Sequence, residues 1–259
     1  MLLANRVGIV SGIGPGMGRD IALAFARNGA DVALAARRVD SLNEVAQEVR
    51  ALGRRAVCVA TDIANADDCR RLVAATLGEL GRIDVLVNNA FKGGVEPLIE
   101  ETTMEAWRDI FNVNVFGSMQ LSQAVLPHMK RQGGGSIVFI NSMSMRVIEP
   151  AMGGYAASKG ALMIAAQTLA KEVGKYKVRV NSVVPGYIWS DKLAGYFRYL
   201  AKQQNRTYEE VHADISSRTA LHHIPTSEEI ADAVLFFASD LSRAITGQAL
   251  DVNGGHFFH

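Results

Sequence analysis

The sequence lacks an excess of charge of either sign. Its 27 lysines and arginines balance 26 aspartates and glutamates, which leaves a formal net charge of +1. Proteins that bind nucleic acid or anionic membrane surfaces carry clustered positive charge, and no such cluster stands out here. We therefore expect neither nucleic acid nor a membrane as a partner.

Cysteine and long apolar runs are also scarce. The two cysteines, Cys58 and Cys69, exclude a disulfide framework. No apolar run approaches the roughly 20 residues that span a bilayer, and the segment MLLANRVGIV lacks the features of a signal peptide. The six histidines show no spacing typical of metal ligands, so no metal site is predicted. A reducing, cytoplasmic setting is expected.

What the sequence does contain is a series of short apolar runs, and hydrophobic residues make up 49% of its 259 positions. Runs that are apolar at every position are typical of parallel strands covered by helices on both faces. The runs span Val7–Val10, Val32–Ala35, Ala56–Ala60, Val85–Val87, Ser136–Ile140 and Val178–Val184, with a weaker one at Leu250–Val252. Helix-like segments alternate with them. This predicts a single α/β domain over residues 1–259, a doubly wound, Rossmann-type parallel sheet of about seven strands.

One segment, residues 187–225, breaks this alternation. It shows no convincing strand and holds several aromatic residues, namely Tyr187, Trp189, Tyr196, Phe197 and Tyr199. Long excursions from a compact domain are usually functional lids or disordered, and the aromatic content favours a lid. We predict that this segment covers the substrate.

A glycine-rich stretch, VSGIGPGMGRD, follows the first apolar run. Backbone N–H groups at the start of a helix suit a phosphate, and glycine permits positive φ and close approach. The common G-x-G-x-x-G spacing fails, because Met17 and Arg19 stand where it requires glycine. The spacing present is Gly12-x-x-x-Gly16-x-Gly18. Taken alone, it is equally consistent with a helix-capping turn.

Tyr155 and Lys159 form a second pattern. Their spacing of four places them on one face of the helix predicted over Gly153–Val173. A nearby ammonium favours the phenolate, so Lys159 is expected to lower the pKa of Tyr155 and fit it for proton exchange. Alone, the same pattern is consistent with a surface Tyr–Lys pair.

Taken in order, these motifs resemble the short-chain dehydrogenase/reductase family. The set comprises Ser11-Gly12-x-x-x-Gly16-Met17-Gly18, Asn88-Asn89-Ala90, Ser142, Tyr155-x-x-x-Lys159 and Pro185-Gly186, and it extends over essentially the whole chain. The resemblance implies that the glycine stretch is a phosphate loop. It also implies a nicotinamide cofactor and hydride transfer between that cofactor and a secondary alcohol or carbonyl.

The resemblance implies four catalytic residues. Tyr155 would exchange a proton with the substrate oxygen, Ser142 would hydrogen-bond that oxygen, and Lys159 would also hold the nicotinamide ribose. Asn114 matches the fourth position, where it would hold a water that links Lys159 to solvent. The pattern Asn-x-x-Gly favours Asn114 over Asn112.

The implied cofactor site comprises Ser11, Gly12, Gly16, Met17, Gly18, Arg37, Arg38, Asp62, Ile63, Asn89, Ala90, Tyr155, Lys159, Pro185, Gly186 and Ile188. Ala36 stands where the family's NAD enzymes carry aspartate, and Arg37 and Arg38 suit the 2′-phosphate of NADP. NADP(H) is therefore the preferred cofactor, with NAD(H) as the alternative. The two arginines could instead be solvated or pair with Asp40. Asp62 is predicted to contact adenine, although it could equally cap a helix.

The expected pocket wall is apolar and irregular, which favours a bulky apolar alcohol or ketone as substrate. Its members are Met143, Met145, Ile148, Met152, the lid aromatics and Phe91. Phe91 stands where the family carries glycine, which changes the shape of this wall. Arg146 is expected to pair with a carboxylate of the protein rather than with the substrate.

The helix predicted over Gly153–Val173 carries no charge between Lys159 and Lys171, so it cannot be a solvated surface helix. Family members commonly pair through this helix. We therefore expect a homotetramer, with a dimer as the alternative.

Two other functions are alternatives to hydride transfer. The main alternative is a nicotinamide-binding regulatory protein without turnover; loss of Ser142, Tyr155 or Lys159 would favour it, and all three are present. A nucleotide-sugar epimerase or dehydratase would have a different glycine spacing and a longer carboxyl half.

Overall fold

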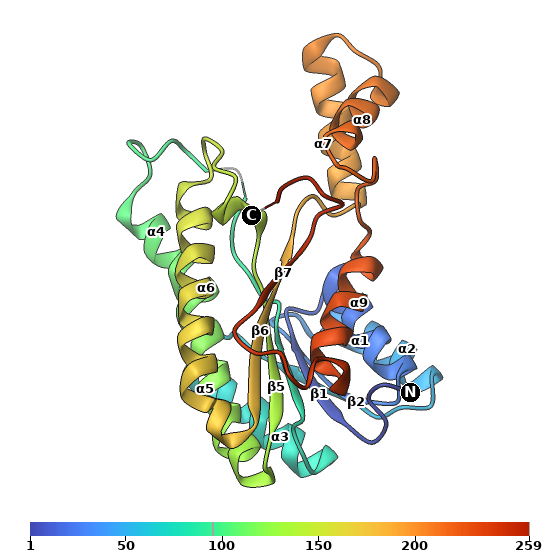
Figure 1. The fold of residues 1–259 in the computed structure, drawn as a ribbon, viewed down its shortest axis with the longest axis vertical. Coiled ribbons are helices and arrows are strands. Elements are labelled where there is room, and N and C mark those ends of the chain that lie inside the picture. Colours follow the sequence, from blue (N-terminus) through green and yellow to red (C-terminus); the bar gives the residue numbers. More distant parts are fainter. Residues whose placement is uncertain (95, 259) are drawn as a thin grey trace.

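The apolar runs form the strands of one parallel sheet. In the computed structural model, which describes residues 1–94 and 96–258, seven strands lie in the order β3-β2-β1-β4-β5-β6-β7 (Figure 1). The strands are β1 (Val7–Ser11), β2 (Asp31–Ala36), β3 (Ala56–Ala60), β4 (Val85–Asn88), β5 (Gly135–Ile140), β6 (Val178–Pro185) and β7 (Ala249–Val252). All neighbouring pairs are parallel, so the predicted fold class and strand positions are confirmed.

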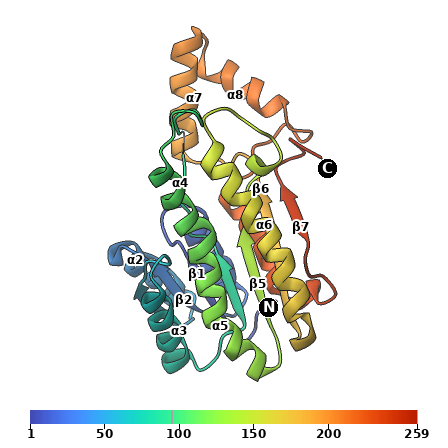
Figure 2. The same cartoon turned by 90° about the vertical axis from the view of Figure 1, so that its left-hand side faces the viewer.

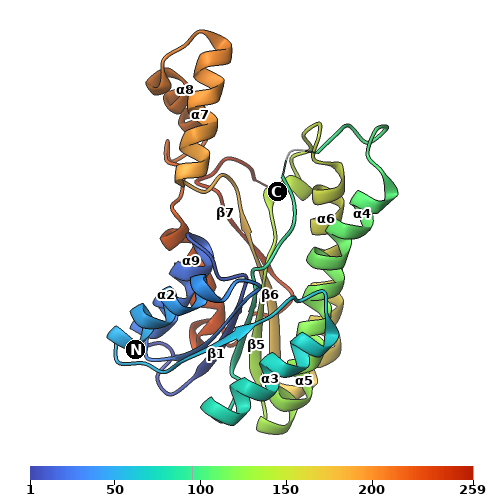
Figure 3. The same ribbon diagram turned by 180° about the vertical axis from the view of Figure 1, so that it is seen from behind.

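Helices cover both faces of the sheet (Figures 1 and 3). One face carries α1 (Met17–Arg27), α2 (Val39–Ala51) and α9 (Ser227–Ala238), and the other carries α3 (Ala66–Leu80), α5 (Ser118–Gln132) and α6 (Gly153–Val173). Successive strand residues point to opposite faces, so Val10 joins the first core and Ile9 the second. This explains why the strands are apolar at every position. In the described part of the chain, no helix has the length and apolarity to cross a membrane.

Two helices fill the segment for which the sequence predicted no strand. They are α7 (Asp191–Gln204) and α8 (Tyr208–Ser217), and they project beyond the carboxyl ends of the strands (Figures 1 and 2). They bury an apolar cluster of their own that includes Phe197, Val211 and Ile215. The α7–α8 hairpin is therefore a small packing unit attached above the carboxyl edge of the sheet.

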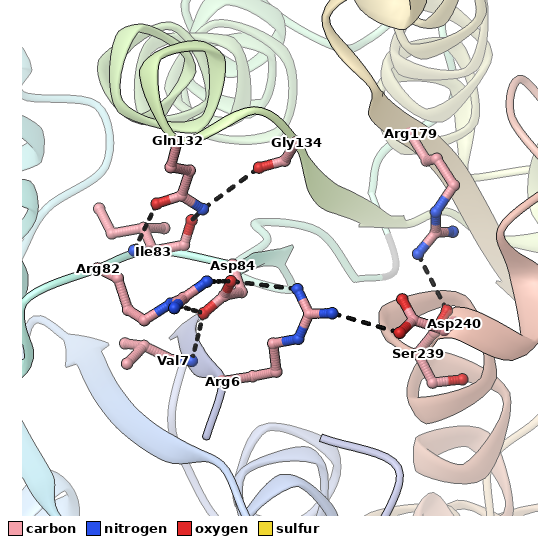
Figure 4. A network of polar contacts seen from close by, with 10 residues as sticks. All are labelled: Arg6, Val7, Arg82, Ile83, Asp84, Gln132, Gly134, Arg179, Ser239 and Asp240. Atoms are coloured by element: carbon pink, nitrogen blue, oxygen red, sulfur yellow. Dashed lines mark hydrogen bonds and ion pairs between the residues drawn. The ribbon is translucent and has the colours of Figure 1, made fainter. Parts of the chain in front are cut away.

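A polar network ties the opposite, amino edge of the sheet together (Figure 4). Asp84 is only 3% exposed and accepts hydrogen bonds from the Val7 N–H at 2.9 Å and from Arg82 Nε and Nη2 at 2.8 and 2.7 Å. Arg6 bridges Asp84 and Asp240, with 3.3 Å to each carboxylate. The network thereby joins β1, the start of β4 and the turn after α9.

Cations line a cavity of about 530 Å³ at this same edge, namely Arg6, Arg82, Lys177, Arg179 and Arg243. The carboxyl ends of α5, α6 and α9 also meet there, because these helices run antiparallel to the strands. Such ends carry partial negative charge, which nearby cations stabilise. Arg179 accordingly donates to the carbonyl of Ser239, the C-cap of α9, at 3.1 Å. The helix dipoles therefore account for the basic lining.

Replacing Asp84 with alanine is expected to lower the free energy of unfolding by about 2 kcal/mol. The change leaves the Val7 N–H without its acceptor and removes the carboxylate that pairs with the Arg82 guanidinium. Urea denaturation at pH 7 measures the effect. The matched control is Asp240→Asn, whose side chain is 80% exposed and is expected to change stability by less than about 0.5 kcal/mol. Equal effects of the two substitutions would contradict this account.

Candidate functional site

The predicted site residues gather at the carboxyl edge of the sheet, around the point between β1 and β4 where the strand order reverses. Open α/β sheets bind ligands in the crevice at such a point. Successive strands β1 to β6 end at or beside Ser11, Arg37, Asp62, Asn89, Ser142 and Pro185. Residues far apart in the sequence therefore share one edge of the molecule.

The glycine stretch forms a tight loop between β1 and α1. Gly12 has φ +78°, and a Cβ atom on it would lie 2.5 Å from the backbone of Ala90. A Cβ on Gly18 would lie 2.4 Å from the carbonyl oxygen of Gly12. Gly16, at φ +99°, is the N-cap of α1 and supplies no side-chain cap. The first N–H groups of α1, which begins at Met17, thus follow a loop in which three of five residues are glycine, as suits a phosphate site.

Ser11 and Asn89 hold this loop against the end of β4. The hydroxyl of Ser11 accepts hydrogen bonds from the N–H groups of Asn89 at 3.2 Å and Ala90 at 3.4 Å. The Asn89 amide donates to the Gly12 carbonyl at 2.9 Å. These contacts join the glycine loop to the end of β4, so the two segments form one wall of the crevice.

The far end of the crevice carries exposed basic groups after β2. Arg37 and Arg38 are exposed, and within residues 1–94 and 96–258 neither side chain has an ion-pair or hydrogen-bond partner. The alternative pairing with Asp40 is therefore not observed. Asp62 accepts from the Ala64 N–H at 3.0 Å, whereas the N-cap of α3 is Asn65. The helix-cap alternative for Asp62 is thus wrong. Ile63, beside it, is buried against Gly117.

Tyr155, Ser142 and Lys159 lie together. The Ser142 side chain lies close enough to the Tyr155 phenol to favour its ionised form. Lys159 is buried, donates through Nζ to the Ile140 carbonyl at 2.7 Å, and lies 5.6 Å from the centre of the Tyr155 ring. The arrangement brings the Tyr155 phenol, the Ser142 hydroxyl and the Lys159 amine together at the carboxyl edge of the sheet.

The pKa values of this pair differ from the sequence expectation. Burial raises the pKa of Tyr155, and the Ser142 side chain opposes that shift only in part. Burial also lowers the pKa of Lys159 to about 7. The expected lowering of the Tyr155 pKa by Lys159 is therefore wrong for the chain alone, because desolvation of the buried phenol sets the direction and Lys159 makes no contribution to the shift.

Asn114 lies in a π-helix, η1 (Asn112–Gly117), between α4 (Met104–Phe111) and α5. Such irregular turns occur often at functional sites. Its amide accepts from the Lys92 N–H at 2.7 Å and donates to the Lys92 carbonyl at 2.8 Å and to Ser158 Oγ at 2.9 Å. Ser158 Oγ in turn donates to the Tyr155 carbonyl at 2.7 Å. Asn114 is thus linked to the backbone of Tyr155.

The turn after β6 closes another side of the site. A Cβ on Gly186 would lie 2.8 Å from Asn253 Cβ and 3.2 Å from the sulfur of Met143. Pro185 ends β6 and pairs with β7, and Ile188 packs against the core beneath α9. This turn therefore approaches the Ser142 segment closely.

The proposed pocket wall is only partly as predicted. Phe91 is 58% exposed and lies edge-on to Tyr155, with 6.2 Å between ring centres. Arg146 forms an ion pair with Asp251 of β7, as expected of a protein carboxylate. The lid aromatics divide into two sets, because Trp189 and Phe197 pack on each other whereas Tyr196 and Tyr199 are 45% and 58% exposed.

Comparison with known proteins agrees with this geometry. Residues 12–256 match the family model described as enoyl-(acyl carrier protein) reductase. The 7alpha-hydroxysteroid dehydrogenase of Escherichia coli K12 is 32% identical over 253 residues, covering 98% of this chain and 94% of that protein. The structure of L-sorbose reductase from Gluconobacter frateurii with NADPH and L-sorbose has a TM-score of 0.91 at 30% identity, covering 99% of this chain and 98% of that one. A 7alpha-hydroxysteroid dehydrogenase with NADH and 7-oxo glycochenodeoxycholic acid has a TM-score of 0.88 at 33% identity, covering 98% and 94%.

Proposed function

Because the chain belongs to the short-chain dehydrogenase/reductase family and is a nicotinamide-dependent oxidoreductase, we propose that Ser142, Tyr155 and Lys159 are its catalytic residues. The observation that carries this proposal is the position of buried Lys159, whose Nζ lies 5.6 Å from the centre of the Tyr155 ring, with the Ser142 side chain beside the same phenol. Asn114 completes the group through Ser158 and the Tyr155 backbone.

The chain's own residues can perform the proton chemistry. In carbonyl reduction, Ser142 donates a hydrogen bond to the substrate oxygen and steadies its developing negative charge. Tyr155 gives that oxygen its proton, and in alcohol oxidation the same group accepts it. When bound, the nicotinamide supplies or accepts the hydride. Burial raises the pKa of Tyr155, so the phenol holds the proton that carbonyl reduction consumes.

The glycine loop supports binding of a dinucleotide, because Gly12 and Gly18 leave room that a Cβ would fill. We propose that this loop and the start of α1 bind the phosphates of the cofactor. The rest of the cofactor would lie along Asn89, Ala90, Pro185, Gly186 and Ile188. Asp62 and Ile63 would meet the adenine. Lys159 would hold the nicotinamide ribose.

NADP(H) is the proposed cofactor, since Ala36 removes the acid that selects NAD and Arg37 and Arg38 are exposed without partners in the described chain. Replacing both arginines with alanine is expected to weaken NADPH binding about 10- to 100-fold and to leave NADH binding within about twofold. Fluorescence titration of both cofactors measures this. Arg131→Ala, on the exposed end of α5, is the control. Equal losses for NADPH and NADH would contradict the proposal.

The substrate is proposed to be a bulky apolar alcohol or ketone. Phe91 is 58% exposed beside Tyr155, and Met143 and Met145 follow Ser142 in the chain. Residues 187–225 are proposed to cover this substrate. A panel of cyclic ketones, steroids and terpenoids, with sugars as the polar comparison, tests the class through nicotinamide absorbance with both cofactors. Turnover confined to the sugars would overturn it.

A homotetramer is the proposed assembly. Ile164 on α6, Phe116 on η1 and Met104 on α4 are 63%, 55% and 59% exposed, and their elements lie against one another. Burial of this apolar surface between subunits would stabilise an oligomer. Light scattering after size exclusion distinguishes a tetramer from the alternative dimer.

A further inference from the structure

The helix that carries Tyr155 begins without a cap of its own. Met152 is the N-cap of α6, and its side chain makes no capping hydrogen bond. A carboxylate from a distant loop takes that place. Glu96 Oε2 accepts from the Gly154 N–H at 2.9 Å, and Glu96 Oε1 accepts from the Tyr155 N–H at 3.1 Å. Both oxygens of Glu96 are therefore used on the first turn of α6, where negative charge is also favoured by the helix dipole.

Glycine residues, which have no side chain, allow the loop that carries Glu96 to approach α6 closely. A Cβ on Gly154 would lie 2.9 Å from Glu96 Oε2, and one on Gly153 would lie 2.6 Å from Ile99. On the loop itself, a Cβ on Gly93 would lie 2.4 Å from the Tyr155 ring. Three glycines, two on the helix and one on the loop, thus shape a single contact around the catalytic tyrosine.

The backbone of Tyr155 is fixed at both of its polar groups. Glu96 accepts from its N–H, and Ser158, itself held by Asn114, donates to its carbonyl. The backbone N–H of Glu96 also donates to the Ala151 carbonyl at 2.8 Å, which anchors the loop just before α6 begins. The loop therefore fixes the backbone of Tyr155 itself, in addition to capping the first turn of α6.

We propose that Glu96 is a positioning residue for Tyr155. Its carboxylate holds the first turn of α6 so that the phenol meets the Ser142 hydroxyl and the substrate oxygen. This inference rests on the proposed catalytic role of Tyr155. Misplacement of a reacting group by about 1 Å can cost about 100-fold in rate, so a loosened first turn has a large effect on turnover.

Glu96→Ala is expected to lower kcat at least about 10-fold, with the Kd for NADPH unchanged. Glu96→Gln should recover part of the loss, because its amide oxygen still accepts one hydrogen bond. Glu101→Gln is the matched control: it changes an exposed acid of the same segment that has no side-chain partner in the described chain. Turnover is measured with NADPH and the best ketone of the substrate panel.

A double-mutant cycle separates positioning from mere structure. If Glu96 acts through the phenol, Glu96→Ala causes little further loss of rate in a Tyr155→Phe background. Hydrogen–deuterium exchange of the peptide that spans residues 150–158 gives a readout independent of substrate, and it should accelerate in Glu96→Ala while the rest of α6 stays protected.

Three results would overturn the inference: wild-type kcat in Glu96→Ala, equal losses in both backgrounds, or unchanged exchange of the 150–158 peptide. Failure of the proposed function is distinguishable, because wild-type turnover in the single Tyr155→Phe variant removes the premise whatever Glu96 does.

Discussion

Replacing Tyr155 with phenylalanine is expected to lower kcat about 10³-fold and to leave NADPH binding unchanged. The substitution removes only the hydroxyl beside Ser142 and keeps the ring that packs against Phe91 and Gly93. Because the ring contacts persist, the fold and the cofactor crevice should persist as well. The loss therefore measures proton transfer.

Single-turnover reduction of a ketone, followed by nicotinamide absorbance, measures this loss without interference from product release. Tyr176→Phe provides the control, since that tyrosine is 39% exposed at the far end of the molecule after α6. Near-wild-type rates in the Tyr155 variant would assign the proton to another group. A loss of NADPH affinity of the same size would show that the hydroxyl serves binding instead.

Replacing Lys159 with methionine is expected to abolish turnover and to make the folded protein more stable at pH 7. Burial lowers the pKa of Lys159 from 10.5 to about 7. The wild-type chain must therefore desolvate a charge at neutral pH, which methionine of similar size avoids. Loss of the hydrogen bond to the Ile140 carbonyl offsets part of the gain, so we expect about 2 kcal/mol.

The pH dependence of this gain has a definite sign. Between pH 7 and 10.5 the unfolded chain holds a proton on Lys159 more firmly than the folded chain does, so wild-type stability rises with pH through this window. The advantage of Lys159→Met is then largest at or below pH 7 and shrinks toward pH 10. Urea denaturation at pH 7, 8 and 9 measures it, with exposed Lys171→Met on the same helix as control. A variant less stable than wild type at pH 7 would contradict the account.

The sequence predicted well those features that local pattern determines. Strands apolar at every position follow directly from a sheet with a core on each face, and the spacing of Tyr155 and Lys159 follows from the pitch of α6. The helices of the 187–225 segment were also readable, because Thr207 and Glu210 form a capping box at the start of α8. That signal was not used in predicting the lid.

Features that depend on distant contacts were not predictable. Glu96 lies 58 positions before Gly154, and nothing near it in the sequence points to α6. The adjoining glycines 153 and 154 were the available signal, since two small residues at the start of a helix leave room for another segment. The raised pKa of Tyr155 likewise arises from burial that only the folded chain produces.

The separate apolar cluster of the α7–α8 hairpin has a consequence for how this protein can change. Phe197, Val211 and Ile215 pack within the hairpin and not into either core of the sheet. The same cluster includes Trp189 and Ile224, so residues 189–224 can be replaced as one cassette, because their apolar contacts lie apart from the two cores of the sheet. Given the proposed role of this segment as the substrate lid, a chimaera with a foreign hairpin should keep the redox chemistry and accept different substrates.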